Sequence, residues 1–465
     1  MLKIKFGTDG WRAIIAQDFT VQNVARVAFA TATWLKKRKA EPLVVIGHDC
    51  RFGGELFVET AIRVLCAEGV KVISHDGFVS TPMISLAVLQ HQADQGIVIT
   101  ASHNPPSYNG FKLKGAHGGP TPPEQIAEVE ELIPDHEIEL KGDLETLEMN
   151  RQLVYVDLER DYLEYIRSKF DIEALRKSPF KMAYDSMYGA GQRVMQELFP
   201  DAVHLHNERN PLFDYTAPEP LHKNLLELSE TMRTTPELKF GLANDGDADR
   251  IALYDEDGNY VDSHHIILLL IHYLNKYKTM RGKVAIAAST TLRVNKMCAL
   301  YKLPCEVTPI GFKYISQIMM KEDVLVGGEE SGGISVKGHI PERDGIFDGL
   351  VIYEFMNQTG KTLKELCQEI YAVVGPFHYE RADLHLSEAD KERVMILCRS
   401  KVGAFGGFRV NDSLQIDGFK YLLDNDCWTM VRLSGTEPLL RIYAEGNTRD
   451  ECLEILSAVR AYFGV

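Results

Sequence analysis

The chain has 465 residues, which at roughly 100 to 200 residues per domain predicts three or four domains. Apolar residues make up 45% and charged residues 25%, ordinary globular values that exclude a disordered or fibrous chain. The net charge is −15, from 51 basic and 66 acidic side chains. So acidic a surface argues against a protein built mainly to bind nucleic acid or anionic lipid, although it allows one small basic pocket.

The eight cysteines form no C-x-x-C pair and no cluster with histidine, which favours reduced, mostly buried residues of a cytosolic protein. The N-terminus lacks the apolar region of a signal peptide. The most apolar run, residues 266–274, is far too short to span a bilayer. We therefore expect a cytoplasmic protein without a membrane partner.

The first third of the chain alternates strand-like and helical segments. Residues 43–46, 70–73 and 97–99 are short apolar runs, and residues 54–68 carry apolar side chains at helical spacing. This alternation predicts a mostly parallel sheet covered by helices.

Breaks in composition divide the chain into four pieces. Residues 133–143 are polar and charged, residues 255–258 read as a turn, and Val-Gly-Pro at 374–376 interrupts a helical segment. The apolar runs 180–184 and 283–288 repeat the strand pattern of the first piece. The predicted domains are residues 1–150, 151–256, 257–374 and 375–465.

The first loop with chemically useful side chains is Thr-Ala-Ser-His-Asn-Pro-Pro at 100–106, directly after the run 97–99. Open α/β sheets place reactive groups at this end of a strand. Two prolines restrict the backbone, so we expect Ser102 on a rigid, exposed bend. The alternative is a surface turn with a passive serine, but the strand end and the nearby Lys112 favour function.

The second loop, residues 244–250, carries Asp245, Asp247 and Asp249 at alternate positions. Three such carboxylates can turn inward on one hard cation, which predicts a Mg²⁺ site completed by a phosphate oxygen or water. An EF-hand is one alternative, but Arg250 occupies the place of its required glycine. A solvated acidic turn is the other.

The third loop, residues 326–333, places Glu329 and Ser331 among glycines, where a ligand can approach closely. A carboxylate and a hydroxyl suit the hydroxyls of a sugar, although a plain glycine-rich turn explains the pattern equally well.

The fourth loop, residues 432–438, offers hydroxyls and consecutive backbone N–H donors between two arginines. Such a nest with planar guanidinium groups suits phosphate, and the alternative is an ordinary turn between strands. The predicted phosphate site comprises Arg432, Ser434, Gly435, Thr436 and Arg441. A positioned serine, a metal loop, a sugar loop and a phosphate nest together indicate phosphoryl transfer on a phosphorylated sugar.

These motifs resemble those of the α-D-phosphohexomutase superfamily, the phosphoglucomutases, phosphomannomutases and phosphoglucosamine mutases. The matching segments, in the order of that family, are F-G-T-D-G-W-R at 6–12, T-A-S-H-N-P-P at 100–106, D-G-D-A-D-R at 245–250, G-E-E-S-G at 328–332 and R-L-S-G-T-E-P at 432–438. The resemblance implies four domains around a central cleft. The first three would be α/β domains with mixed sheets and similar cores, and the last a smaller α+β domain.

The resemblance also implies the role of each residue. Ser102 would carry the phosphoryl group, and its phosphate would join Asp245, Asp247 and Asp249 around Mg²⁺. Glu329 and Ser331 would hold sugar hydroxyls, and the fourth loop would bind the phosphate that is not transferred. The residues around the transferring phosphate would be Arg12, His103, Lys112 and Arg250.

The implied reaction transfers the phosphoryl group of Ser102 to a hexose phosphate. The hexose 1,6-bisphosphate turns around, and its other phosphate returns to Ser102. We expect Lys112 to act as acid or base, because a metal and Arg250 nearby would lower its pKa. The alternative for Lys112 is a permanently charged phosphate contact. The only predicted partners are small sugar phosphates, and the oligomeric state is not readable from the sequence.

The choice of sugar rests on two positions. Residues 339–345 resemble a stretch of phosphoglucomutases, with Arg343 where those enzymes usually have lysine, so we expect Arg343 to bind substrate. Gly333 stands where phosphomannomutases and phosphoglucosamine mutases usually have histidine, which favours glucose. The alternatives are a phosphomannomutase, a phosphoglucosamine mutase or a dual-specificity enzyme, and more remotely a Mg²⁺-dependent sugar-phosphate phosphohydrolase or a silent sugar-phosphate sensor.

Overall fold

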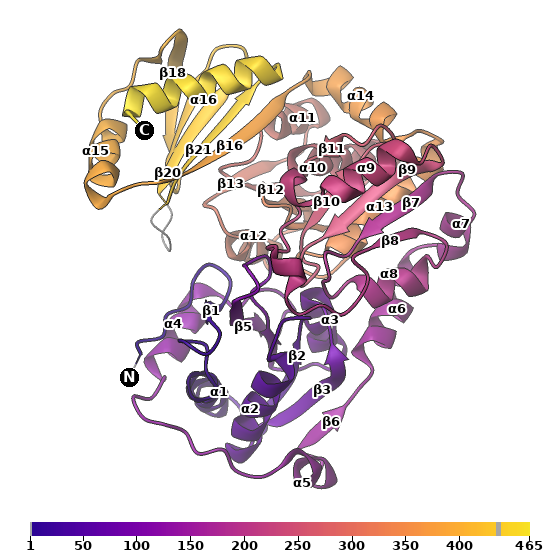
Figure 1. The fold of residues 1–465 in the computed structure, drawn as a ribbon, viewed down its shortest axis with the longest axis vertical. Helices are drawn as coiled ribbons and strands as arrows, with labels where there is room; N and C mark the ends of the chain where they lie inside the picture. Colours follow the sequence, from indigo (N-terminus) through magenta and orange to yellow (C-terminus); the bar gives the residue numbers. More distant parts are fainter. Residues whose placement is uncertain (1, 434–438) are drawn as a thin grey trace.

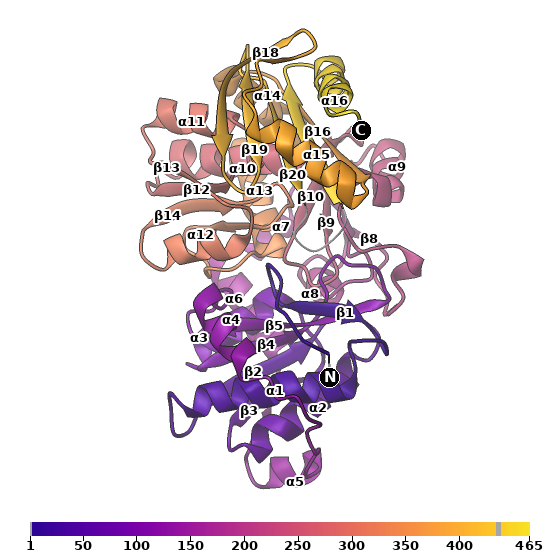
Figure 2. The same ribbon diagram turned by 90° about the vertical axis from the view of Figure 1, so that its left-hand side faces the viewer.

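The computed structural model describes residues 2–433 and 439–465, which form four β-sheets in successive segments of the chain (Figure 1). The first and the last sheet lie at opposite ends of the molecule in both views (Figures 1 and 2). Among the described residues, no helix is both long and apolar enough to cross a membrane.

The first sheet contains six strands and is covered by helices on both faces. Its strands are β1 (Trp11–Ile14), β2 (Leu43–His48), β3 (Lys71–Phe78), β4 (Gln95–Ile99), β5 (Tyr108–Gly115) and β6 (Leu153–Tyr155). Its helices are α1 (Val21–Lys36), α2 (Gly54–Ala67), α3 (Thr81–Gln90), α4 (Pro123–Glu131) and α5 (Leu144–Met149). Val44 and Ile46 pack with α1 and α2, whereas Val45 between them packs with α3. Both faces are therefore buried, as the continuous apolar runs predict.

The second sheet has the strand order β11-β10-β9-β7-β8. Its strands are β7 (Lys181–Asp185), β8 (Val203–Leu205), β9 (Leu238–Asn244), β10 (Ile251–Tyr254) and β11 (Tyr260–Val261). The helices of this segment are α6 (Leu158–Lys169), α7 (Ile172–Arg176), α8 (Gln192–Leu198), the short η1 (Phe213–Tyr215) and η2 (His222–Asn224), and α9 (Leu226–Thr234).

The third sheet has the order β13-β12-β14-β15. Its strands are β12 (Lys283–Ala287), β13 (Cys305–Thr308), β14 (Val324–Gly328) and β15 (Ile334–Val336). Its helices are α10 (Ser263–His272) with its extension η3 (Tyr273–Tyr277), α11 (Arg293–Tyr301), α12 (Phe312–Met319), α13 (Gly345–Thr359) and α14 (Leu363–Val374). The apolar run 266–274 thus covers most of the buried helix α10 and the first two residues of η3.

The first three predicted loops occupy the same point in the topology of their sheets. The serine loop joins β4 to β5, the metal loop joins β9 to β10, and the sugar loop joins β14 to β15. In each case the strand before the loop pairs in parallel with an interior strand of its sheet, namely β2, β7 or β12. The strand after the loop pairs antiparallel with the strand before it. The three α/β domains therefore present one equivalent loop each.

The C-terminal domain is built differently, on a fully antiparallel sheet of order β16-β21-β20-β19-β18-β17. Its strands are β16 (His378–His385), β17 (Ala404–Phe405), β18 (Phe408–Gln415), β19 (Phe419–Leu423), β20 (Trp428–Leu433) and β21 (Leu439–Gly446). Its helices are α15 (Glu388–Arg399) and α16 (Arg449–Phe463).

The expected fold class is confirmed: three mixed-sheet α/β domains precede a smaller α+β domain. The exact domain limits remain proposals, and β6, which pairs with β3 of the first sheet, lies beyond residue 150. Because β10 begins at Ile251, directly after Arg250, the EF-hand alternative is excluded.

Candidate active site

Ser102 lies in a buried bend between β4 and β5, and its hydroxyl faces the metal loop. Its Oγ donates a hydrogen bond to Asp245 Oδ2 at 2.7 Å and lies 3.3 Å from His103 Nδ1. Its φ is +53°, a left-handed conformation that costs energy in a residue other than glycine. The expectation of an exposed bend is wrong, since Ser102 is only 1% exposed. The second domain covers it, with Gly246 packed against its carbonyl oxygen.

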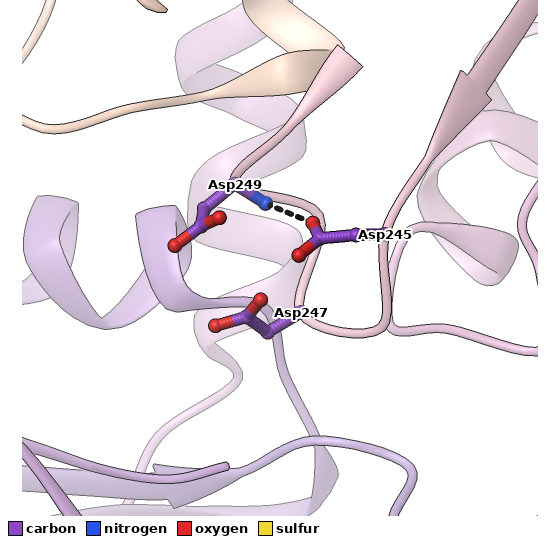
Figure 3. Close-up of side chains that lie close together, drawn as sticks. All are labelled: Asp245, Asp247 and Asp249. Atoms are coloured by element: carbon purple, nitrogen blue, oxygen red, sulfur yellow. Dashed lines mark hydrogen bonds between the residues drawn. The ribbon is translucent and has the colours of Figure 1, made fainter. Parts of the chain in front are cut away.

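The three aspartates of the metal loop converge as predicted (Figure 3). One oxygen from each lies within 4.8 Å of the others, and all three side chains are buried. Burial and the charges of Asp247 and Asp249 raise the pKa of Asp245 well above its ordinary value. One oxygen each of Asp247 and Asp249 is buried and has no hydrogen-bond partner among the residues that the structure describes. Three clustered carboxylates, two of which have a free buried oxygen within the described part of the chain, fit a hard cation such as Mg²⁺.

Lys112 lies against these aspartates from the first domain. Its Nζ is 2.7 Å from Asp247 Oδ2 and 3.0 Å from both Asp249 Oδ2 and Asp9 Oδ2. Burial lowers the pKa of Lys112, but the three carboxylates outweigh burial and raise it above its usual range. This direction is opposite to the expected one. The geometry therefore favours the alternative that Lys112 is a permanently charged phosphate contact. Its acid/base role remains a prediction.

Arg343 joins residues of three domains. Its Nη2 pairs with Asp9 Oδ2 of the first domain and lies 2.7 Å from Asp249 Oδ2 of the second. A Cβ at Gly333 would lie only 2.4 Å from Arg343 Cδ, so the arginine packs directly on the sugar loop. Arg343 thus positions Asp249, and its predicted contact with substrate stays a prediction.

The other predicted groups of the transferring-phosphate site surround Ser102. Arg250 Nη2 lies 3.4 Å from His103 Nε2, and Arg12 Nη1 donates to Asn104 Oδ1 at 2.7 Å. Burial and the nearby positive charges lower the pKa of His103 well below its ordinary value. The ring is therefore neutral at pH 7 and able to accept a proton or hydrogen bond.

Glu329 and Ser331 both lie in the sugar loop, one buried and one half-buried. Glu329 Oε1 accepts a hydrogen bond from the Gly311 N–H at 2.8 Å. Burial, assisted by the charge of Glu330, raises the pKa of Glu329 to about 7.

In the C-terminal domain, Arg432 and Arg441 stand directly opposite each other on β20 and β21. Each lies near a carboxylate, with Arg432 Nε 3.1 Å from Asp417 Oδ2 and Arg441 Nε 3.7 Å from Asp383 Oδ1. Like charges opposite each other are unfavourable in a sheet, so the pair suits a bound anion. The remaining predicted members of this site, Ser434, Gly435 and Thr436, lie outside the described residues.

Two residues of the site were not singled out from the sequence. Asp9 pairs with Lys112 and Arg343, and its only signal was its place in the F-G-T-D-G-W-R segment. Thr81, at the start of α3, donates its hydroxyl to Asp247 Oδ2 and its N–H to the Asp247 carbonyl. The signal there was Ser-Thr-Pro at 80–82, which is typical of a helix start.

Comparison with known proteins places the chain in one family. Models of the phosphoglucomutase/phosphomannomutase family match α/β/α domain I at residues 3–139, domain II at 160–258, domain III at 262–374 and the C-terminal domain at 388–461.

Similar proteins match over almost the whole chain. A phosphoglucomutase/phosphomannomutase of Thermococcus kodakarensis is 30% identical, covering 97% of this chain and 96% of the relative. A phosphoglucosamine/phosphogalactosamine mutase of Sulfurisphaera tokodaii is 28% identical, covering 98% of both. A crystal structure from Thermus thermophilus, provisionally assigned as a phosphomannomutase, has a TM-score of 0.87 at 32% identity and full coverage of both chains. The chain belongs to the phosphoglucomutase/phosphomannomutase family of intramolecular phosphotransferases.

Proposed function

We propose that this enzyme interconverts hexose 1-phosphates and 6-phosphates through a phosphoserine at Ser102 and a hexose 1,6-bisphosphate. One observation carries the proposal: the Ser102 hydroxyl of the first domain lies 2.7 Å from Asp245, one of three buried carboxylates of the second domain. A phosphate on Ser102 would therefore lie beside the metal loop, where a bound Mg²⁺ would supply the positive charge that phosphoryl transfer needs.

The positive charges around Ser102 would offset the main obstacle to this reaction, which is the repulsion between two phosphate groups. Phosphoserine and a sugar phosphate each carry nearly two negative charges at neutral pH. Bringing them to about 4 Å costs on the order of 15 kcal/mol at an effective dielectric constant near 20, before screening. Mg²⁺ held by Asp245, Asp247 and Asp249 would, when bound, neutralise part of this charge. Arg12 and Arg250 bring further positive charge close to Ser102.

The remaining domains supply contacts that do not depend on which phosphate is transferred. Glu329 and Ser331 present acceptors for sugar hydroxyls, and Arg432 and Arg441 present a paired cationic site for the second phosphate. Such contacts allow the bisphosphate to bind in either orientation. We propose the matching hexose 1,6-bisphosphate as the activator that phosphorylates Ser102.

The preference for glucose expected from Gly333 loses its support. A side chain at position 333 would collide with Arg343, so Gly333 is explained by packing without reference to the sugar. The names of the similar proteins point instead to phosphomannomutase, phosphoglucosamine mutase or dual-specificity activity. We therefore propose that mannose and glucosamine phosphates are substrates alongside glucose phosphate.

The test is a mutase assay with glucose 1-phosphate, mannose 1-phosphate and glucosamine 1-phosphate, each with Mg²⁺ and a trace of the matching bisphosphate. We expect mannose or glucosamine phosphate to be converted at least as efficiently as glucose phosphate, judged by kcat/KM. A preference for glucose over both of about tenfold would contradict the sugar assignment. Release of inorganic phosphate without a 6-phosphate product would instead support a phosphohydrolase.

A further inference from the structure

A buried charged pair, Asp49 and Arg51, follows β2 and lies beneath the serine loop. Both side chains are 0% exposed, and Arg51 Nε lies 3.3 Å from Asp49 Oδ2. We propose that this pair is the positioning device that holds the backbone around Ser102 in its reactive conformation. The inference rests on the proposed function, because it assigns how the phosphoryl carrier is held.

Arg51 binds the main chain of the serine loop at four points. Its Nη2 donates to the carbonyl oxygens of Ser102 and Asn104, each at 2.6 Å. Its Nη1 donates to those of Pro105 and Tyr108 at 2.9 and 3.0 Å. Two consecutive prolines leave this bend short of N–H donors, so its inward-facing carbonyls need donors from elsewhere. A planar guanidinium can serve four acceptors at once, which the single ammonium of lysine cannot.

Asp49 reaches the same loop through a hydroxyl. Its Oδ1 accepts the Arg51 N–H at 2.9 Å, and its Oδ2 accepts the Thr100 hydroxyl. The Thr100 Oγ1 in turn accepts the Ser102 N–H at 2.8 Å. The backbone of Ser102 is thus held on both sides, by Thr100 at its N–H and by Arg51 at its carbonyl.

This double hold explains how Ser102 keeps its φ of +53°. A non-glycine residue stays in that region only where its surroundings determine the conformation. Asp49, Arg51 and Thr100 act on the backbone of Ser102, not on its hydroxyl, and are therefore positioning residues. Their loss should misplace Oγ, and a displacement of about 1 Å can cost on the order of 100-fold in rate.

The structure offers a matched control in the same domain. Arg26 is likewise buried, at 1% exposure, and donates to the carbonyl oxygens of Pro134 and Leu2 at 2.7 and 3.1 Å. It belongs to α1 and makes its contacts with the N-terminal segment and the 133–143 region. Arg26→Lys therefore removes a guanidinium fork of the same kind without touching the serine loop.

The experiment compares Arg51→Lys and Thr100→Val with Arg26→Lys, at a temperature where all are folded. We expect Arg51→Lys to lower kcat about 100-fold and Thr100→Val about 10-fold, with KM for the sugar phosphate changed by less than about threefold. Phosphorylation of Ser102 by the bisphosphate, followed by intact mass, should slow in parallel. Hydrogen exchange of a peptide spanning residues 100–110 should quicken in both variants. Arg26→Lys should lower the melting temperature with kcat within about twofold of the parent.

The proposal is overturned if Arg51→Lys keeps kcat within about twofold of the parent, or if only its KM changes. It is also overturned if Arg26→Lys lowers kcat as much as Arg51→Lys does. Should Arg51→Lys fail to fold, Thr100→Val, which keeps the side-chain volume, decides by the same criteria. If the parent shows no mutase activity, the proposed function fails and hydrogen exchange alone decides. Unchanged exchange at 100–110 in Arg51→Lys would then overturn the positioning role, and faster exchange there but not in Arg26→Lys would support it.

Discussion

The serine and metal loops differ sharply from the cationic face of the C-terminal sheet, the face of β20 and β21 that carries Arg432 and Arg441. The difference is in how deeply their charged side chains are buried. Lys112 and Asp247 are both 0% exposed, whereas Arg432 is 15% and Asp417 36% exposed. Removing one partner of a buried ion pair leaves the other charge unpaired in the protein interior, which strongly destabilises the fold. A more exposed ion pair contributes less to stability. The first region is therefore suited to fixed geometry, and the second is suited to the reversible capture of an anion that we propose for it.

The contacts between domains are largely buried in both regions, so they do not account for this difference. Ion pairs join the first three domains, since Lys112 pairs with Asp247 and Arg343 pairs with Asp9 and Asp249. The C-terminal domain meets the third through ion pairs of the buried Arg293 with Asp426 and Glu445. An apolar cluster that includes Ala288 and Trp428 lies at the same junction. Because the charges around Ser102 are fully buried and those of Arg432 and Asp417 are more exposed, we expect changes in the buried region to act mainly on kcat and changes on the cationic face mainly on KM.

The largest effect is expected for Ser102→Ala. Loss of the phosphoryl carrier should reduce mutase activity by about 10³-fold or more, because no other group replaces the covalent intermediate. The measurement is a mutase assay with the bisphosphate activator present. Ser107→Ala is the matched control, an exposed serine of the same loop that should keep full activity. Full activity of Ser102→Ala would remove the phosphoserine mechanism.

The next effect concerns the metal loop. Chelation of divalent cations by EDTA should reduce activity about 10²- to 10³-fold, and added Mg²⁺ should restore it. Asp247→Asn keeps the side-chain volume but loses a ligand charge, so excess Mg²⁺ should not restore that variant. Asp257→Asn, in the exposed turn after β10, serves as control. If Asp247→Asn keeps full activity in EDTA, the aspartate cluster is not required for catalysis.

On the cationic face, Arg432→Lys should raise KM about tenfold and leave kcat within about twofold, because lysine keeps the charge but loses the fork that matches phosphate. The exposed Arg409→Lys on β18 is the control. Steady-state kinetics at several salt concentrations make the measurement. A fall in kcat as large as that of the metal-loop variants would break the division between the two regions.

The smallest effect is a pH dependence of stability from Glu329. Its pKa in the folded protein is about 7, above the ordinary 4.5, so between these values the folded protein holds a proton that the unfolded chain has lost. The stabilisation is complete below the unfolded pKa and is lost as pH rises through about 7. From pH 5 to 8 the parent should therefore lose about 1–3 kcal/mol relative to Glu329→Gln. Urea denaturation without metal or substrate measures this, and a constant difference across the range would contradict it.

Local patterns were enough to predict much of the scaffold. The apolar runs 43–46 and 97–99 became β2 and β4, and the helical spacing of 54–68 became α2. These elements are readable because burial on both faces gives a strand a continuous apolar run, whereas burial of one face gives a helix apolar residues at a period of about 3.6. The placement of loops at strand ends was readable for the same reason.

The details of the site were less accessible. The direction of the pKa shift of Lys112 was predicted wrongly because three carboxylates, two of them from another domain, surround its ammonium group. The burial of Ser102 was missed because the covering loop lies more than a hundred residues away in the chain. Burial and charge at one atom depend on such distant neighbours, which periodicity does not encode.

By itself, the sequence determined the alternation of strands and helices in the first domain, the order of the four loops and the donors and acceptors that they carry. Residue type and local spacing decide these properties, since a carboxylate, a hydroxyl or a guanidinium keeps its donors and acceptors wherever it is placed. The classes of the other domains were implied by the family resemblance. Only the tertiary structure decided that Asp9, Thr81 and Arg51 support the site, and that Gly333 packs directly against Arg343. Those roles arise from the packing of domains against one another, which brings distant side chains within a few ångströms and removes the water that would screen them.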